Sequence, residues 1–174
     1  IKDYGPILGE SLESITTTPD NKWLFAASPE GHLKQISLES QQVVHDYGHI
    51  HSRTIKCLET TRDSKWLLTG GYDGHVKRIS VKNKEVDKDF GEVTHSQISS
   101  MKITPDNEKL LVGDYGCFLK LISSKDGELI KDFGQQFDYG GISGIVIAAD
   151  QKSFFTSSYY GKLKQTWHVG LPLS

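Results

Sequence analysis

The sequence predicts an all-β fold of four repeats of about 43 residues, because three short markers recur in one phase. The first marker is an aspartate, an aromatic residue and a glycine, and its glycines are spaced 43 residues apart: Gly5, Gly48, Gly91 and Gly134. The second marker is an aspartate that follows an apolar segment: Asp20, Asp63, Asp106 and Asp150. The third marker is a lysine 14 residues after that aspartate: Lys34, Lys77, Lys120 and Lys164.

Each repeat contains four short apolar segments separated by turn residues, which is the pattern of β-strands. In the second repeat the first three segments begin near Ile55, Trp66 and His75. A fourth segment leads to the aromatic residue and glycine of the first marker, as Leu129 and Ile130 do in the third repeat. No segment of helix length shows a 3.6-residue period, so we expect four strands in each repeat.

A lone four-stranded sheet cannot bury both of its faces, whereas sheets stacked around an axis bury them and protect their edges. We therefore expect β-propeller blades, namely four four-stranded antiparallel repeats of about 43 residues. Small residues at one position of the first strand suit a crowded axis: Ser14, Cys57, Ser100 and Gly144. We expect residues 1–174 to form a single propeller, or a propeller part, with repeats at 6–48, 49–91, 92–134 and 135–174 plus 1–5.

The second repeat carries His51, Thr69 and Asp73, the last within a Tyr-Asp-Gly turn. In this the chain resembles the WD-repeat β-propeller family, and the resemblance extends over nearly the whole sequence. It implies that these three residues form a hydrogen-bonded set that braces the blade. The repeats are degenerate, because the family's closing Trp-Asp pair is absent and pairs such as Ile79-Ser80 stand in its place.

The resemblance also implies that one terminus completes the blade begun by the other. The last repeat ends after its third strand, near Trp167, and the segment 1–5 matches 130–134 except for Tyr in place of Phe. We therefore expect an N-terminal strand that completes the last blade. The chain could belong to a propeller of seven or eight blades, pair with a second copy in an eight-bladed ring, or close alone. The start at Ile1 and the degenerate ends favour the first alternative.

Composition narrows the classes of partner. The formal net charge is -2, so nothing draws the chain toward nucleic acid or an anionic membrane, and we expect neither as a partner. Two cysteines are too few for a disulfide framework, which favours a reducing, cytoplasmic location. There is no apolar run of 18 residues and no signal peptide pattern.

Motifs for catalysis are missing, so we expect no enzyme, no cofactor and no metal. The sequence has no phosphate-binding Gly-x-x-x-x-Gly-Lys loop, no His-Glu-x-x-His pair and no Gly-x-Ser-x-Gly turn. The seven histidines are dispersed, whereas a metal site needs three or four converging ligands. Cys57 lies in the small-residue column and is interpreted as a packed side chain rather than a reactive thiol.

Tyrosines recur in the turn between the second and third strands, on the face where loops connect the blades. The predicted partner-binding residues on this loop face are Tyr72, Tyr115, Tyr159, Tyr160, Arg53 and His95. Tyrosine gives large, rigid contact area at low entropic cost, which suits a protein or peptide partner. Alternatively, each tyrosine packs on the loop of the neighbouring blade. The repeated lysines would cover apolar surface with their stems rather than form an anion-binding stripe.

These observations predict a non-catalytic protein-interaction scaffold that uses its loop face, by analogy with the family. Two alternatives remain. One is a small-molecule-binding or enzymatic propeller with a ligand at the central channel, and the other is a purely structural subunit of a large assembly. The small residues on the channel strand argue for a plain channel.

Overall fold

A computed structural model describes residues 3–9 and 11–167, and the described residues form fifteen β-strands in four antiparallel sheets without any helix. The first two sheets contain β1 (Ser14–Thr17), β2 (Trp23–Ala27), β3 (His32–Ser37), β4 (Val43–His49), β5 (Ile55–Thr60), β6 (Trp66–Gly71), β7 (His75–Ser80) and β8 (Glu85–Glu92). The last two contain β9 (Ile98–Ile103), β10 (Lys109–Asp114), β11 (Phe118–Ser123), β12 (Leu129–Gln135), β13 (Ile142–Ile147), β14 (Ser153–Ser158) and β15 (Leu163–Trp167). The predicted all-β class with antiparallel sheets is confirmed.

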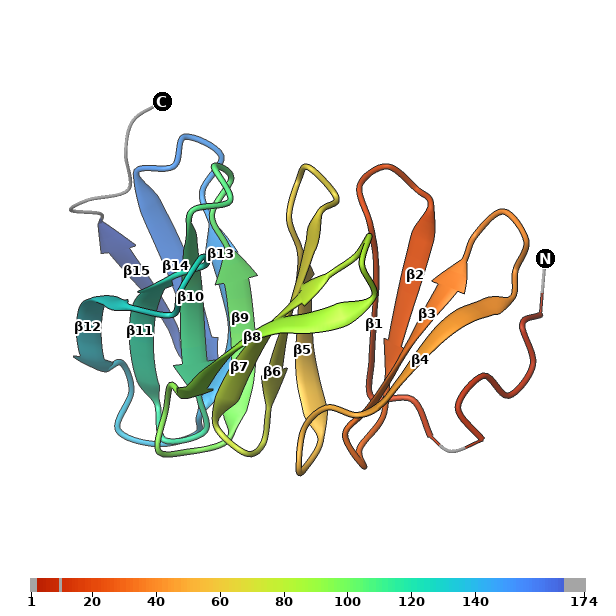
Figure 1. Ribbon diagram of the computed structural model, residues 1–174. Helices are drawn as coiled ribbons and strands as arrows, with labels where there is room; N and C mark the ends of the chain where they lie inside the picture. The colour runs from red at the N-terminus through yellow and green to blue at the C-terminus, as the bar shows by residue number, and fades with distance from the viewer. Residues whose placement is uncertain (1–2, 10, 168–174) are drawn as a thin grey trace.

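The sheets follow one another along an open arc in chain order, with the first and the fourth at its two ends (Figure 1). Within each sheet, strands that are consecutive in the chain are hydrogen-bonded neighbours. The first strands line the concave side of the arc, because β1 contacts β5, β5 contacts β9, and β9 contacts β13. The turns between second and third strands therefore share one rim of the arc.

The aspartate of the second marker forms the turn between the first two strands of a sheet. Thr18 Oγ1 donates a hydrogen bond to Asp20 Oδ1 at 2.6 Å, and the Lys22 amide donates to the same oxygen at 3.2 Å. The intervening Asn21 has a φ of 56°, a left-handed conformation that asparagine tolerates better than most residues. The same threonine–aspartate bond recurs at Asp63.

The other two markers belong to one interaction between the third and fourth strands. In the second sheet, Asp89 accepts a hydrogen bond from the Gly91 amide at 2.8 Å and pairs with the Lys77 ammonium at 2.9 Å. Gly91 has a φ of 77°, which favours glycine at this position. Lys34 pairs in the same way with Asp46 at 3.3 Å, so in the first two sheets the repeated lysine pairs within its own sheet.

Apolar clusters fill the space between consecutive sheets. Between the first two sheets, Phe25 and Leu33 pack against Ile55, Leu67 and Ile79, and all five side chains are fully buried. Corresponding clusters join the second sheet to the third and the third to the fourth. Each sheet is thus stabilised mainly by its neighbours in the arc.

The prediction that residues 1–5 complete the last blade is not confirmed. The described part of the fourth sheet has three strands, and residues 3–9 belong to no strand. The Ile7 carbonyl instead accepts a hydrogen bond from Lys34 of the first sheet at 3.3 Å. Because the first and fourth sheets lie at opposite ends of the arc (Figure 1), this segment does not reach β15 of its own chain. Residues 1–2 and 168–174 lie outside the described residues.

Candidate partner-binding face

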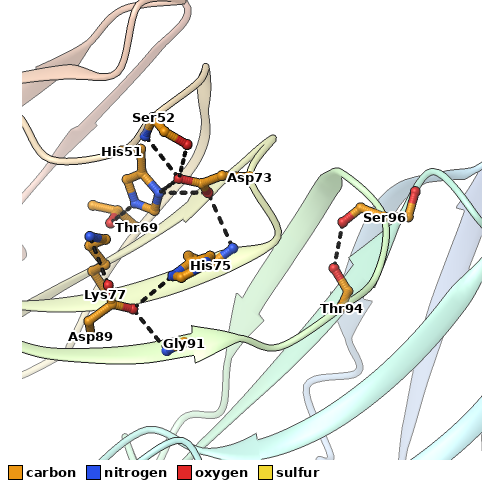
Figure 2. Close-up of polar contacts among 10 residues, drawn as sticks. All are labelled: His51, Ser52, Thr69, Asp73, His75, Lys77, Asp89, Gly91, Thr94 and Ser96. Carbon is orange, nitrogen blue, oxygen red and sulfur yellow. Dashed lines mark hydrogen bonds and ion pairs between the residues drawn. The ribbon is translucent and has the colours of Figure 1, made fainter.

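The second sheet contains a buried polar set made of the three residues that the family resemblance singled out. His51 Nδ1 lies 2.9 Å from Asp73 Oδ1, and His51 Nε2 lies 2.8 Å from Thr69 Oγ1 (Figure 2). Since an ionised carboxylate can only accept hydrogen bonds, His51 Nδ1 carries the hydrogen and donates the hydrogen bond to Asp73. The Ser52 amide adds a further hydrogen bond to Asp73 at 3.0 Å. His51 precedes β5, Thr69 lies on β6 and Asp73 lies in the turn before β7. The set therefore connects three parts of the second sheet.

Two opposing effects act on the Asp73 carboxyl. Burial by itself would raise its pKa, but hydrogen bonds and charge from His51, with backbone bonds from Ser52 and His75, hold the pKa well below the usual range. A carboxylate whose pKa is lowered by folding stabilises the protein above its unfolded pKa of about 3.9. This contribution is lost as the pH falls below that value toward the folded pKa.

We therefore expect Asp73→Asn to flatten the acid dependence of stability. Between pH 5 and pH 3 the free energy of unfolding of the wild type should fall more steeply than that of the variant, since the variant has no carboxyl to protonate there. Urea denaturation at a series of pH values measures both slopes. Equal slopes would show that Asp73 is not held ionised by folding.

The tyrosines of the loop face contact one another across three sheets. The hydroxyl oxygens of Tyr72 and Tyr115 lie 3.0 Å apart, and those of Tyr115 and Tyr159 lie 3.1 Å apart. Tyr115 meets Tyr72 edge-on and stacks on Tyr159, with ring centroids 5.6 and 5.3 Å apart. Burial, and after it the hydrogen bonds with Tyr115, raise the pKa of Tyr72 and Tyr159 above its usual value. These three residues form what we call the tyrosine row.

A polar groove adjoins the row and brings three predicted binding residues together. Its volume is about 310 Å³, and its lining includes Arg53, Tyr72 and His95. The rest of the lining is polar: Asp73, Glu92, Thr94, Ser96 and Gln97. The His95 side chain is 93% exposed. The loop that carries His95 is held by a 2.7 Å hydrogen bond, which the Thr94 hydroxyl donates to the Ser96 carbonyl (Figure 2).

Tyr160, the remaining predicted binding residue, stands apart from the row. It is 72% exposed and meets Tyr139 edge-on, with ring centroids 5.4 Å apart. Asp114, which directly precedes Tyr115 of the row, is buried and accepts a hydrogen bond from the Phe118 amide at 2.9 Å. Burial raises the pKa of Asp114.

Sequence reasoning missed the ion pairs that lie on or next to the first strands of the sheets. Lys56 pairs with Glu13 at 2.5 Å, and Lys102 pairs with Glu59 at 3.0 Å, so each pair links neighbouring sheets. Glu59 and Lys102 line a cavity of about 600 Å³ along the concave side. They occupy the same repeat position, 43 residues apart, and this spacing was the signal that could have revealed them. The expected plain channel is therefore wrong.

Cys57 lies in the small-residue column as expected, packed against the cluster that contains Met101. Burial raises the pKa of its thiol to about 12. Within residues 3–9 and 11–167, no three histidine, cysteine, aspartate or glutamate side chains are grouped as metal ligands. The same residues include no helix long and apolar enough to cross a membrane.

Residues 41–78 match the family model of the WD domain, G-beta repeat. The matched range contains β4, β5, β6 and all three members of the buried polar set. No curated protein sequence matches the chain. WD repeats commonly mediate protein–protein interaction and are generally non-catalytic. The match and the repeated all-β architecture together support the assignment of this chain to the WD-repeat family.

Proposed function

We propose that the chain is a non-catalytic scaffold whose loop face binds a protein or peptide segment. The tyrosine row next to the polar groove is the observation that carries this proposal. The general role of WD repeats in protein–protein interaction supports it. A cytoplasmic location is part of the same proposal, supported by the free cysteines Cys57 and Cys117.

The row suits binding because its side chains are already ordered. Hydrogen bonds and ring contacts fix Tyr115 between Tyr72 and Tyr159, so little side-chain entropy is lost when a partner covers them. The phenol rings provide apolar contact, while the neighbouring groove offers donors and acceptors on Arg53 and His95. Contact area beside a few oriented polar groups is what a peptide segment requires.

Peptides selected from a displayed library against the 174-residue chain provide the test. Arg53→Ala and His95→Ala should each weaken a selected peptide about tenfold, measured by calorimetry, because both side chains line the groove; a tenfold loss of affinity corresponds to about 1.4 kcal/mol. These variants avoid the row itself, whose mutual packing would otherwise confound binding with folding.

Leu129→Ala is the matched control, because Leu129 is 57% exposed on β12, an outermost strand, and does not line the groove. It should bind as the wild type does. The proposal fails if both groove variants retain full affinity, or if Leu129→Ala weakens binding as much as they do.

A further inference from the structure

The first sheet exposes positions that are buried or half-buried at the interfaces inside the arc. Leu12 is 49% exposed and Ile15 is 62% exposed. The residues at the same repeat position as Leu12 are fully buried: Ile55, Ile98 and Ile142. Two residues at the position of Ile15 are only 5% exposed: Met101 and Ile145. The free face of the first sheet is thus built like the faces that accept a preceding sheet.

The fourth sheet exposes the complementary positions. Leu163 is 72% exposed, whereas its repeat equivalents are fully buried against the following sheet: Leu33, Val76 and Leu119. Trp167, on the same strand, is 68% exposed. The two ends of the arc therefore present the two halves of one interface that the chain already forms three times.

Residues 3–9 belong to no strand, but residues 3–5 have the local shape of the end of an outermost strand. The Gly5 amide donates to Asp3 Oδ1 at 2.8 Å with a φ of 64°, and Gly48 repeats this with Asp46 at 2.8 Å and a φ of 66°. Ile7 makes the same contact with the following sheet as its repeat equivalent Val93 does. The Ile7 carbonyl accepts from Lys34, and the Val93 carbonyl accepts from Lys120 at 2.9 Å. Residues 3–5 hence lie where the outermost strand of a preceding sheet would end.

The open edge of β15 carries the residues that such a strand contacts elsewhere. In the first sheet, Lys34 pairs with Asp46 at 3.3 Å. In the same sheet, the Tyr47 hydroxyl donates to Gln35 Oε1 at 2.9 Å. The repeat equivalents on β15 are Lys164 and Gln165, and both are exposed.

Residue types on the N-terminal segment match this edge. Glutamine occurs at the Gln35 position only in the first and fourth sheets, because the second and third sheets have Arg78 and Leu121 there. The aromatic residue of the first marker is tyrosine in the first sheet, at Tyr47. In the second and third sheets, which lack the glutamine, it is phenylalanine, at Phe90 and Phe133. Tyr4 is the remaining tyrosine of this marker, and Gln165 is the remaining glutamine. Asp3 and Lys164 are likewise the repeat equivalents of Asp46 and Lys34, which form an ion pair in the first sheet.

We propose that two copies of this chain pair head to tail, with the fourth sheet of each packed on the first sheet of the other. Asp3-Tyr4-Gly5 of each copy then adds to the partner's β15, pairing Asp3 with Lys164 and Tyr4 with Gln165. A second copy supplies both missing surfaces without altering the three interfaces already packed within the chain. Such a head-to-tail contact, made twice, closes a ring of two copies.

The mass of the 174-residue chain in solution is the first measurement. Light scattering at micromolar concentration should give twice 19.4 kDa. Leu163→Asp and Ile15→Asp should both give the single-chain mass with unchanged circular dichroism, because each side chain is exposed in the single chain. Leu129→Asp, on an exposed leucine away from both end faces, should remain dimeric. A single-chain mass for the wild type, or dissociation by Leu129→Asp, would overturn the proposal.

Disulfide formation between introduced cysteines distinguishes pairing with a second copy from closure within one chain. Residues opposite each other in antiparallel strands have Cα atoms about 4.5–5.5 Å apart, within disulfide range. Asp3→Cys and Lys164→Cys, made in separate chains and mixed, should form a disulfide-linked dimer under mild oxidation. Neither variant alone should do so. If the double variant forms its disulfide only within one chain, the four blades close alone and the proposal is wrong.

Discussion

Phe25→Ala should lower the free energy of unfolding by about 3–5 kcal/mol, the range found when a buried phenylalanine is truncated in a packed core. Phe25 is fully buried and packs at the interface between the first and second sheets, beside Ile55 and Leu67. The loss combines reduced apolar burial with a cavity that flanking strands cannot close without breaking their register. Urea denaturation followed by circular dichroism measures it.

Phe118→Ala is the control for this prediction, because Phe118 begins β11 and is 43% exposed. Its truncation should change the free energy of unfolding by no more than about 1 kcal/mol. The two variants remove the same atoms, so their difference isolates burial between sheets. Equal losses would contradict the role assigned to the apolar clusters.

The strands and turns could be predicted from the sequence because their causes are local. The threonine–aspartate bond at Asp20 and the bond between Asp89 and Gly91 each involve residues two positions apart. Such contacts leave a mark at a constant spacing, and that spacing indicated the repeated strands and turns. The set of His51, Thr69 and Asp73 was accessible through its resemblance to a family pattern.

Closure of the arc could not be predicted in the same way. The likeness between residues 1–5 and 130–134 indicates what kind of strand the segment forms, but not which sheet receives it. The receiving sheet depends on the rotation between consecutive sheets, which side-chain packing in the clusters determines. A small change in that rotation, repeated at each interface, decides which sheet edge the segment can reach.

The tyrosine row shows a similar limit. The sequence placed Tyr72, Tyr115 and Tyr159 at one repeat position and left open whether they bind a partner or pack on the neighbouring loop. The structure shows that they pack on one another, since hydroxyl groups from successive sheets come within 3.1 Å. Contact across sheets and availability to a partner are compatible here, because Tyr159 remains 49% exposed.

The buried polar set also positions the loop face, because Asp73 directly follows Tyr72 and lines the same groove. His51 connects this turn to Thr69 on β6, so the turn is held by a side chain that is itself fully buried. A change at His51 should therefore alter both stability and the order of the groove.

His51→Ala should accordingly lower the free energy of unfolding by about 2–4 kcal/mol. Removal of the imidazole leaves the Asp73 carboxylate without its main partner and the Thr69 hydroxyl unpaired, and buried charged or polar groups left unpaired cost this much. His95→Ala, which removes a side chain that is 93% exposed, should change stability by less than about 0.5 kcal/mol. Urea denaturation of both variants at pH 7 makes the comparison, and hydrogen exchange at the Ser52 and His75 amides, which are hydrogen-bonded to Asp73, should quicken only in His51→Ala. Unchanged exchange at these two amides despite a loss of stability would mean that His51 fills space in the blade without holding the turn.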